Sequence, residues 1–320
     1  MRSSNNSENS FFHSKTIYGL LIIAIISIIP FISSNPYFLR LAVLTFIYSI
    51  LSMSLSLLLD FTGIVSLGHA AFFGIGAYAT GIMSTKIGLP FWFILPIGAL
   101  ITAIIAFLFG LLTFKFLKGL YFALASWALG EILCSIYMNV NFFGGTNGIR
   151  GIPEPTILGF AISSDLSFYY FAMIFSIFTL ISVERLLLSR IGRAWVAIRE
   201  DQTVAGVMGI NVLLFQVMSF SMSAFYAGIA GSLYAYYEVF ISPRIFTVWE
   251  SIALLCMVLV GGRKSLLGSV VGAAIFTFLP EVLRGVGQYR MIVYGVILLV
   301  TILFRPKGLI PPYHFLKAKE

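Results

Sequence analysis

Charged residues are scarce in this chain. Asp, Glu, Lys and Arg make up 10% of its 320 residues, whereas 59% are hydrophobic, and the mean hydropathy is +1.01. Soluble domains carry about 25% charged residues, so the composition excludes a protein built around one soluble core. Because a membrane span needs about 20 residues, the chain has room for about ten spans. The sequence therefore predicts an all-α, polytopic membrane helix bundle.

Cysteine is also scarce, since the chain has 2. Cys134 and Cys256 both fall inside predicted spans, which argues against a disulfide framework or a metal site and indicates apolar packing. The sequence shows no G-x-S-x-G elbow and no catalytic triad. The pair Gly74 and Gly76 lacks the third glycine of a dinucleotide loop, and the glycines of a P-loop are missing before Lys264. We expect a chain that is not an enzyme and that itself binds no metal and no cofactor.

Ten apolar runs are candidates for membrane spans. The first follows basic residues, as a signal peptide would, but its end lacks small residues spaced one apart, so we expect an uncleaved span. The first, third and eighth runs are short or interrupted by glycine. The runs cover residues 17–34, 38–59, 63–84, 91–114, 120–139, 168–188, 213–237, 249–261, 267–283 and 291–304.

Basic residues are distributed unevenly between the two sides of the membrane. With a cytoplasmic N-terminus and ten spans, fourteen of the 20 Lys and Arg residues fall in cytoplasmic segments and six fall outside. The positive-inside rule therefore places both termini in the cytoplasm, with tails at 1–16 and 305–320. We expect one membrane domain in the cell inner membrane. No basic patch interleaved with exposed aromatic residues suggests binding to nucleic acid.

Two connections are longer than a turn. Residues 141–167, rich in Gly and Pro, are expected to form an ordered, turn-rich loop outside the cell, and residues 189–211 are expected in the cytoplasm. The four spans that begin near residue 38 and the four that begin near residue 213 enter from opposite sides. Two such blocks would make an inverted repeat, although they share no evident sequence identity.

The run from Ser66 to Tyr78 combines apolar character with many small residues. Ser66, Ala70 and Gly74 have a four-residue spacing, which lets membrane helices approach closely. We therefore expect this segment to pack inside the protein or to line a path, with His69 as a hydrogen-bonded packing residue rather than a ligand. The residues assigned to the translocation path or core packing are Ser66, Gly68, His69, Phe72, Gly74, Gly76, Tyr78 and Glu131.

Several acidic residues fall in or beside predicted spans, and four of them bear on the function. Glu131 lies midway through the fifth span, where a charge is costly, so it either pairs to hold helices in register or faces the path. The structural role is the favoured alternative. Asp60, Glu250 and Glu281 fall near span ends, where water or lipid headgroups are expected to solvate them.

The cytoplasmic connection contains one predicted amphipathic helix that ends at Gly209. Its apolar stripe holds Ala194, Ala197, Ile198, Ala205 and Met208. A helix held between two spans in this way is suited to docking into a groove of another protein. The alternative is a helix that lies at the lipid interface.

These segments together resemble a known family, the LivM-type permeases of branched-chain amino-acid ABC transporters (the LivM/LivH permease family). The resemblance covers nearly the whole chain after residue 38. The matching blocks, in order, are residues 66–78, 119–124, 130–132, 144–149, 192–194, 199–201, 208–211, 279–281 and 304–309.

The resemblance implies an importer of branched-chain amino acids with four kinds of subunit. This permease would pair with a second homologous permease, two cytoplasmic ABC ATPase subunits that bind ATP and Mg, and an extracytoplasmic substrate-binding protein. The loop facing that binding protein would hold Gly145, Thr146, Asn147 and Gly148. The ATPase-coupling residues would be Gly192, Arg193, Ala197, Ile198, Arg199, Glu200, Asp201, Ala205, Met208 and Gly209.

The sequence departs from the family pattern at one turn, and two other functions are alternatives to an amino-acid importer. Arg263 and Lys264 stand where relatives carry an apolar residue and a glycine, which argues against a tight glycine turn there. A urea or short-chain amide permease of the same family would have a very similar sequence. An ion-coupled secondary carrier would instead need ion ligands on broken helices at the membrane midplane.

Overall fold

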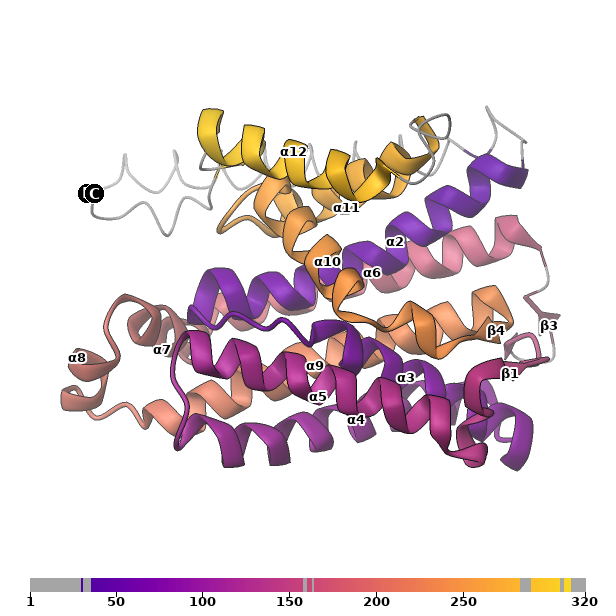
Figure 1. The fold of residues 1–320 in the computed structure, drawn as a ribbon, viewed down its shortest axis with the longest axis horizontal. Coiled ribbons are helices and arrows are strands. Elements are labelled where there is room, and N and C mark those ends of the chain that lie inside the picture. The colour runs from indigo at the N-terminus through magenta and orange to yellow at the C-terminus, as the bar shows by residue number, and fades with distance from the viewer. Residues whose placement is uncertain are drawn as a thin grey trace, which may run out of the picture.

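Most of the described chain forms helices that run roughly along one direction (Figure 1). The structure is a computed structural model. The predicted first span at 17–34, the tail at 1–16 and most of the tail at 305–320 lie outside the described residues. The structure describes Pro30 and residues 36–157, 160–162, 164–282, 289–305 and 308–311.

Five helices of the described chain are long and apolar enough to cross a membrane. The spans predicted at 91–114 and 120–139 have the same bounds as two of them. Turn residues set these bounds, because Pro90 precedes the first and Gly119, at φ 55°, precedes the second. The five are α2 (Pro36–Ser56, continued by the π-helical turn η1, Leu57–Thr62), α4 (Phe91–Phe114), α5 (Leu120–Asn139), α6 (Asp165–Leu188) and α9 (Val212–Glu238).

Four further helices in apolar segments are shorter. They are α3 (His69–Ile82, continued by η2, Met83–Ile87), α10 (Val248–Gly261), α11 (Leu266–Val282) and α12 (Arg290–Phe304). Within the described residues, these nine helices correspond to nine of the ten predicted spans. The structure therefore supports a polytopic membrane helix bundle, whereas the count of ten and the inverted repeat stay predictions.

The two ends of the bundle carry different connections. Short strands and turns form one end, which we call the β1 end, and α7 (Arg190–Glu200) and α8 (Gln202–Val207) project from the other, the α7 end (Figure 1). At the β1 end, β1 (Ile149–Arg150) pairs antiparallel with β4 (Phe240–Ile241), and β2 (Thr156–Ile157) pairs with β3 (Phe160–Ala161). The 3-10 turns η3 (Asn141–Phe143), η4 (Gly145–Asn147) and η5 (Pro243–Ile245) flank these strands.

Polar contacts join connections that are predicted to lie on the same side of the membrane. At the β1 end, Arg40 pairs with Glu238 at 2.8 Å, and Lys86 Nζ donates a hydrogen bond to the Phe142 carbonyl at 2.7 Å. At the α7 end, α7 contacts the end of α2 through Arg199. The grouping of the loops at two opposite ends thus agrees with the predicted topology.

Helix α3 lies at the centre of the bundle, against α9 and α4. Every residue from His69 to Tyr78 is buried. Glycines allow the close approach to α9: a Cβ on Gly76 would lie 2.6 Å from the Cα of Gly228, and a Cβ on Gly231 would clash with the backbone of α3. Because lipid tails are as apolar as leucine, such close backbone packing, rather than a hydrophobic driving force, holds helices together in a membrane.

We predict that Gly76→Ala destabilises the protein. The added methyl group would press on the backbone of Gly228, and overpacking of this kind costs about 1–3 kcal/mol of unfolding free energy. Thermal unfolding in detergent measures the effect. Gly130→Ala is the matched control, since a Cβ there would meet its nearest neighbour, Gly68 Cα, at an ordinary 3.7 Å. Equal unfolding midpoints for the two variants would contradict the packing described for α3 and α9.

Candidate coupling site and transport core

The segment that joins α6 to α9 is attached to the bundle through one face of α7. Ser189 begins this helix by accepting hydrogen bonds from two amides of its first turn, at 3.2 and 3.5 Å. Trp195 and Ile198 are buried, and Trp195 Nε1 donates a hydrogen bond to the Phe215 carbonyl of α9 at 2.9 Å. The predicted amphipathic character of α7 is confirmed, because its apolar side chains face the bundle.

The predicted single helix is wrong, because the segment breaks at Asp201. This residue adopts an extended conformation, and its carboxylate accepts hydrogen bonds from the amides of Thr203 at 2.7 Å and Val204 at 3.1 Å, which begins α8. The amides of Val204 and then Thr203 hold the pKa of the Asp201 carboxyl below its ordinary value. Gly209, at φ 85°, ends the segment as predicted.

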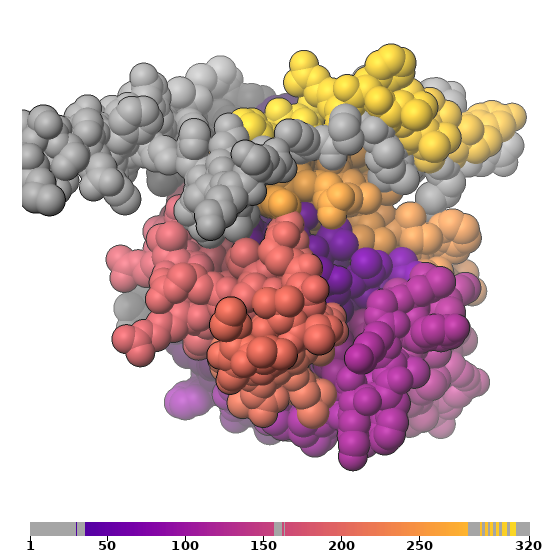
Figure 2. Space-filling model, turned by 90° about the vertical axis from the view of Figure 1, so that its left-hand side faces the viewer, coloured from indigo at the N-terminus to yellow at the C-terminus, as the bar shows by residue number. Residues whose placement is uncertain are grey.

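Helix α8 turns its large apolar side chains away from the bundle. Ala205 is buried, but Val207 and Met208 are 84% and 78% exposed, and Val204 is exposed as well. Of the predicted apolar stripe, Ala205 thus faces the bundle, whereas Met208 is open to a partner or to lipid. We call Val204, Val207 and Met208 the apolar tip. The end of the molecule that carries this tip faces the viewer in Figure 2, with the end of α4 beside it.

Arg199 connects α7 to the end of α2. Its guanidinium donates a hydrogen bond from Nη1 to the Asp60 carbonyl at 2.6 Å and pairs through Nη2 with Glu200 at 3.0 Å. Gly63 lies directly under this side chain, because a Cβ at Gly63 would come within 2.9 Å of Arg199 Cγ. Arg199 is thus largely covered by protein, whereas Glu200 is exposed.

Asp60 is a candidate functional residue, and its predicted exposure is wrong. It was expected near water or lipid headgroups, yet it is 1% exposed. Ser56 Oγ donates a hydrogen bond to Asp60 Oδ2 at 2.8 Å, and Arg263 Nε lies 3.8 Å from Oδ1. Because a buried carboxylate is costly unless it is paired, these contacts explain its position. We call Asp60, Arg199 and Arg263 the Asp60 cluster. Ser56 lies four residues before Asp60, which is one helical turn, and this spacing is the feature of the sequence that could have predicted a hydrogen-bonded aspartate.

The turn between α10 and α11 forms despite its two basic residues. Lys264 adopts a left-handed conformation at φ 62°, which a non-glycine residue rarely takes. A tight turn therefore forms here with lysine, rather than glycine, in the left-handed position. The turn brings Arg263 next to Asp60.

The start of α3 is held by hydrogen bonds from three other helices. Leu67 N donates to Ser126 Oγ of α5, and Ala70 N donates to Ser251 Oγ of α10, both at 3.0 Å. His69 Nε2 lies 2.8 Å from Ser54 Oγ of α2. Since the Ser54 hydroxyl donates its proton to the Leu51 carbonyl, His69 Nε2 carries the proton of this contact. His69 is thus a hydrogen-bonded packing residue, as predicted.

The other residues predicted for the path or core, except Glu131, surround this centre. Gly74 lies against Phe246, where a Cβ would come within 2.9 Å of the ring. Tyr78 stacks on Tyr137 of α5, with 4.0 Å between ring centroids. The structure brings together, all buried, Ser66, Gly68, His69, Phe72, Gly74, Gly76 and Tyr78.

Glu131 lies apart from this group. It is exposed on α5 and accepts a hydrogen bond from Trp127 Nε1 of the same helix at 3.1 Å. The favoured interpretation, a buried residue that pairs two helices, is wrong within this chain. The alternative, a residue that faces the path, stays a prediction.

The predicted loop site lies at the β1 end. Thr146 and Asn147 are exposed in the turn η4. Gly148 has φ 67° and packs against the Ile241 carbonyl, so that a side chain here would prevent the pairing of β1 with β4. The turn is therefore held in place by the strand pair beside it.

The described residues hold no group of three or more His, Cys, Asp or Glu side chains placed to bind a metal ion. Cys134 and Cys256 are both free and buried.

Comparison with known proteins gives matches along nearly the whole chain. The model of a family described as branched-chain amino acid transport system / permease component matches residues 37–302. The high-affinity branched-chain amino acid transport system permease protein LivM of Salmonella typhimurium and that of Escherichia coli are each 32% identical to this chain, over 92% of it and 74% of the relative. The probable LivM permease of Methanocaldococcus jannaschii is 28% identical over 83% of this chain and 90% of the relative. No solved structure matches.

The helix bundle and these matches define the class of this protein, which is the membrane permease component of a transport system. The chain belongs to the family of branched-chain amino-acid transport permeases.

We predict that Arg199→Ala loosens α7. The substitution removes the hydrogen bond to Asp60, and a hydrogen bond to a charged group contributes about 1.5–3 kcal/mol, so the amides of α7 are expected to exchange with solvent at least about tenfold faster. Hydrogen exchange with mass spectrometry of residues 190–200 measures this. Arg193→Ala is the control, because Arg193 bonds to the nearby Leu188 carbonyl rather than to α2. Equal exchange in both variants would show that Arg199 does not anchor α7.

Proposed function

We propose that this chain is the permease subunit of an ATP-binding-cassette importer that moves leucine, isoleucine and valine into the cytoplasm. The observation that carries the proposal is the α7–α8 segment in a chain of this family. The segment is attached to the bundle through Trp195 and Arg199 and turns its apolar tip outward. An exposed apolar surface of this kind is suited to a groove in a partner protein.

The proposal assigns ATP hydrolysis to other subunits. The chain lacks the glycines of a P-loop, so two ABC ATPase subunits supply ATP and Mg chemistry at the α7 end. A second homologous permease completes the membrane part, and a substrate-binding protein docks at the β1 end, on the turn that holds Thr146 and Asn147. This arrangement places the α7 end and both termini in the cytoplasm and the protein in the inner membrane.

The proposed coupling runs through the Asp60 cluster. ATP binding closes the partner ATPases and shifts α7 through the apolar tip. Arg199 transmits the shift to the end of α2, and Asp60 also faces Arg263 in the turn between α10 and α11. Because these contacts join segments far apart in sequence, one displacement of α7 acts on three helices at once.

We place the transport path beside α3. The small side chains of this helix would leave its backbone groups accessible to a substrate in the path. Glu131 then lies on the exposed face of α5 that borders the path. Both α3 and α10 are short and hold the second place in a block of four helices, which supports an inverted repeat. Short or broken helices in matching places of two halves are typical of substrate pathways.

Uptake into proteoliposomes tests the proposed substrate. The vesicles would contain this chain, its partner permease and the ATPases, with ATP inside and the binding protein outside. Labelled leucine is expected to accumulate only with ATP, and labelled urea is expected to stay outside. Accumulation of urea instead of leucine would contradict the proposed substrate and indicate a urea permease. Uptake driven by an ion gradient without ATP would contradict the ABC importer and indicate a secondary carrier.

Substitution in the apolar tip tests the coupling surface. Val207→Glu places a charge on a side chain that is 84% exposed, so the fold is expected to persist while the ATPases no longer co-purify with the permease. Val140→Glu, an exposed valine at the other end, is the control and is expected to retain them. Equal ATPase recovery with weaker membrane association of α8 would favour a helix that lies on lipid.

A further inference from the structure

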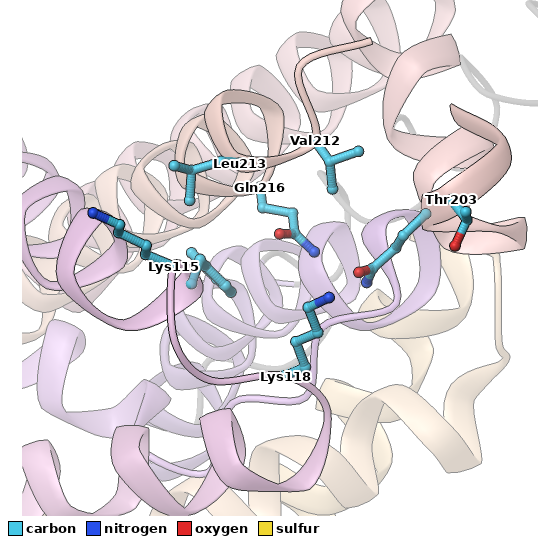
Figure 3. Close-up of a pocket in the computed structure, with 8 residues that line it drawn as sticks. Lys115, Lys118, Thr203, Val212, Leu213 and Gln216 are labelled. Carbon is cyan, nitrogen blue, oxygen red and sulfur yellow. The ribbon is translucent and has the colours of Figure 1, made fainter. Parts of the chain in front are cut away.

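A pocket of about 360 Å³ opens at the α7 end between the α4–α5 connection, α8 and the start of α9 (Figure 3). Lys118 lines it from the connection, Gln202 and Thr203 line it from α8, and Gln216 lines it from α9. No acidic side chain is among its lining residues. The pocket therefore offers hydrogen-bond donors and positive charge to a ligand.

Lys118 has no carboxylate partner in the part of the chain that the structure describes. In Figure 3 its ammonium group points into the pocket toward Gln216. Lys115, on the same connection, behaves differently, because its ammonium points away from Gln216 and lies 5.5 Å from the centroid of the Phe116 ring. One lysine of the pair is thus free to bind an anion inside the pocket.

Gln216 is the second observation that points to a ligand. It is 7% exposed, and within the described residues its side-chain amide makes no hydrogen bond. Figure 3 shows this amide facing the same space as Lys118. Because this amide opens into the pocket, a group bound there that accepts its hydrogen bond would stabilise the site.

The start of α9 adds to the positive potential. Val212 and Leu213, in the first turn of this 27-residue helix, also line the pocket. Asn211 Oδ1 already accepts the amide proton of Leu214, so the contribution of α9 is the positive end of its dipole, which favours an anion.

We infer that this pocket binds the phosphate group of an anionic phospholipid. It lies where α4 ends and α5 begins, next to a strongly exposed apolar surface that acyl chains can cover. That surface is formed by Leu112, Phe116, Leu120 and Tyr121. Basic pockets between membrane helices on the cytoplasmic side are suited to anionic headgroups. An acidic side chain of a partner ATPase could pair with Lys118, but it would leave the apolar surface uncovered.

A phospholipid in this place would join the α4–α5 connection to the coupling segment. Its phosphate would contact Lys118 on one side and Gln216 and Thr203 on the other. The inference depends on the proposed topology, which puts the α7 end in the cytoplasmic leaflet, but not on the transported substrate. Lipid composition would then affect how firmly α8 is held.

Calorimetric titration of the full-length chain in detergent tests the inference. The probes are dihexanoyl phosphatidylglycerol, which is anionic, and dihexanoyl phosphatidylcholine, which is zwitterionic. Phosphatidylglycerol is expected to bind more tightly, and Lys118→Gln is expected to weaken it about fivefold, as a lysine near an anionic surface predicts. Gln216→Leu is expected to weaken it as well, and Lys118→Arg to preserve it.

Arg185→Gln is the matched control, since Arg185 is an exposed basic residue at the same end and its loss changes the net charge equally. Equal affinity for the two lipids, or equal losses in Lys118→Gln and Arg185→Gln, would overturn the inference. Binding of glycerol phosphate as tight as that of phosphatidylglycerol would assign the site to a soluble phosphate. Release of the lipid on addition of the ATPases, together with weaker ATPase binding in Lys118→Gln, would show that the pocket is a contact site for the ATPase. None of these results depends on transport activity.

Discussion

A protein chain inside a bilayer has to satisfy its backbone hydrogen bonds within the protein, and residues 63–68, which form no helix, rely in part on side chains of other helices. Hydroxyl groups of Ser126 and Ser251 accept the amide protons of Leu67 and Ala70. Ser251 lies ten residues before Gly261, the last residue of α10, which corresponds to about 15 Å of helix. Helix α3 therefore begins beside the first turn of α10, at the far end of that helix from Gly261.

The rest of the bundle is arranged around this interrupted helix. The start of α3 is hydrogen-bonded to α5 and α10, which therefore lie close to it. Along its length, α3 packs against α9 at the short distance that Gly76 and Gly228 allow. The same interruption places Gly63 and Asp60 at the α7 end, where Arg199 of the coupling segment contacts both. The packing at the centre and the attachment of α7 are thus two consequences of one irregular segment.

Much of the fold could be predicted because apolar length and turn residues mark membrane helices directly, as α4 and α5 show. The coupling segment was placed correctly, but its break at Asp201 depends on whether a carboxylate caps a new helix, which periodicity does not reveal. Asp60 and Glu131 were misplaced for a related reason. Position along a span predicts depth in the membrane, whereas burial depends on the facing helices, and these put Asp60 inside and Glu131 on the surface.

Amide hydrogen exchange at Leu67 and Ala70 tests whether α5 and α10 enclose the start of α3. Both amides precede or begin α3 and depend on side chains of other helices, so they exchange slowly only if α5 and α10 enclose this segment. We expect exchange as slow as that of Ala227, which is buried in the middle of α9. Exchange as fast as that of exposed Lys118 would show that residues 63–68 are open to water and would contradict this enclosure.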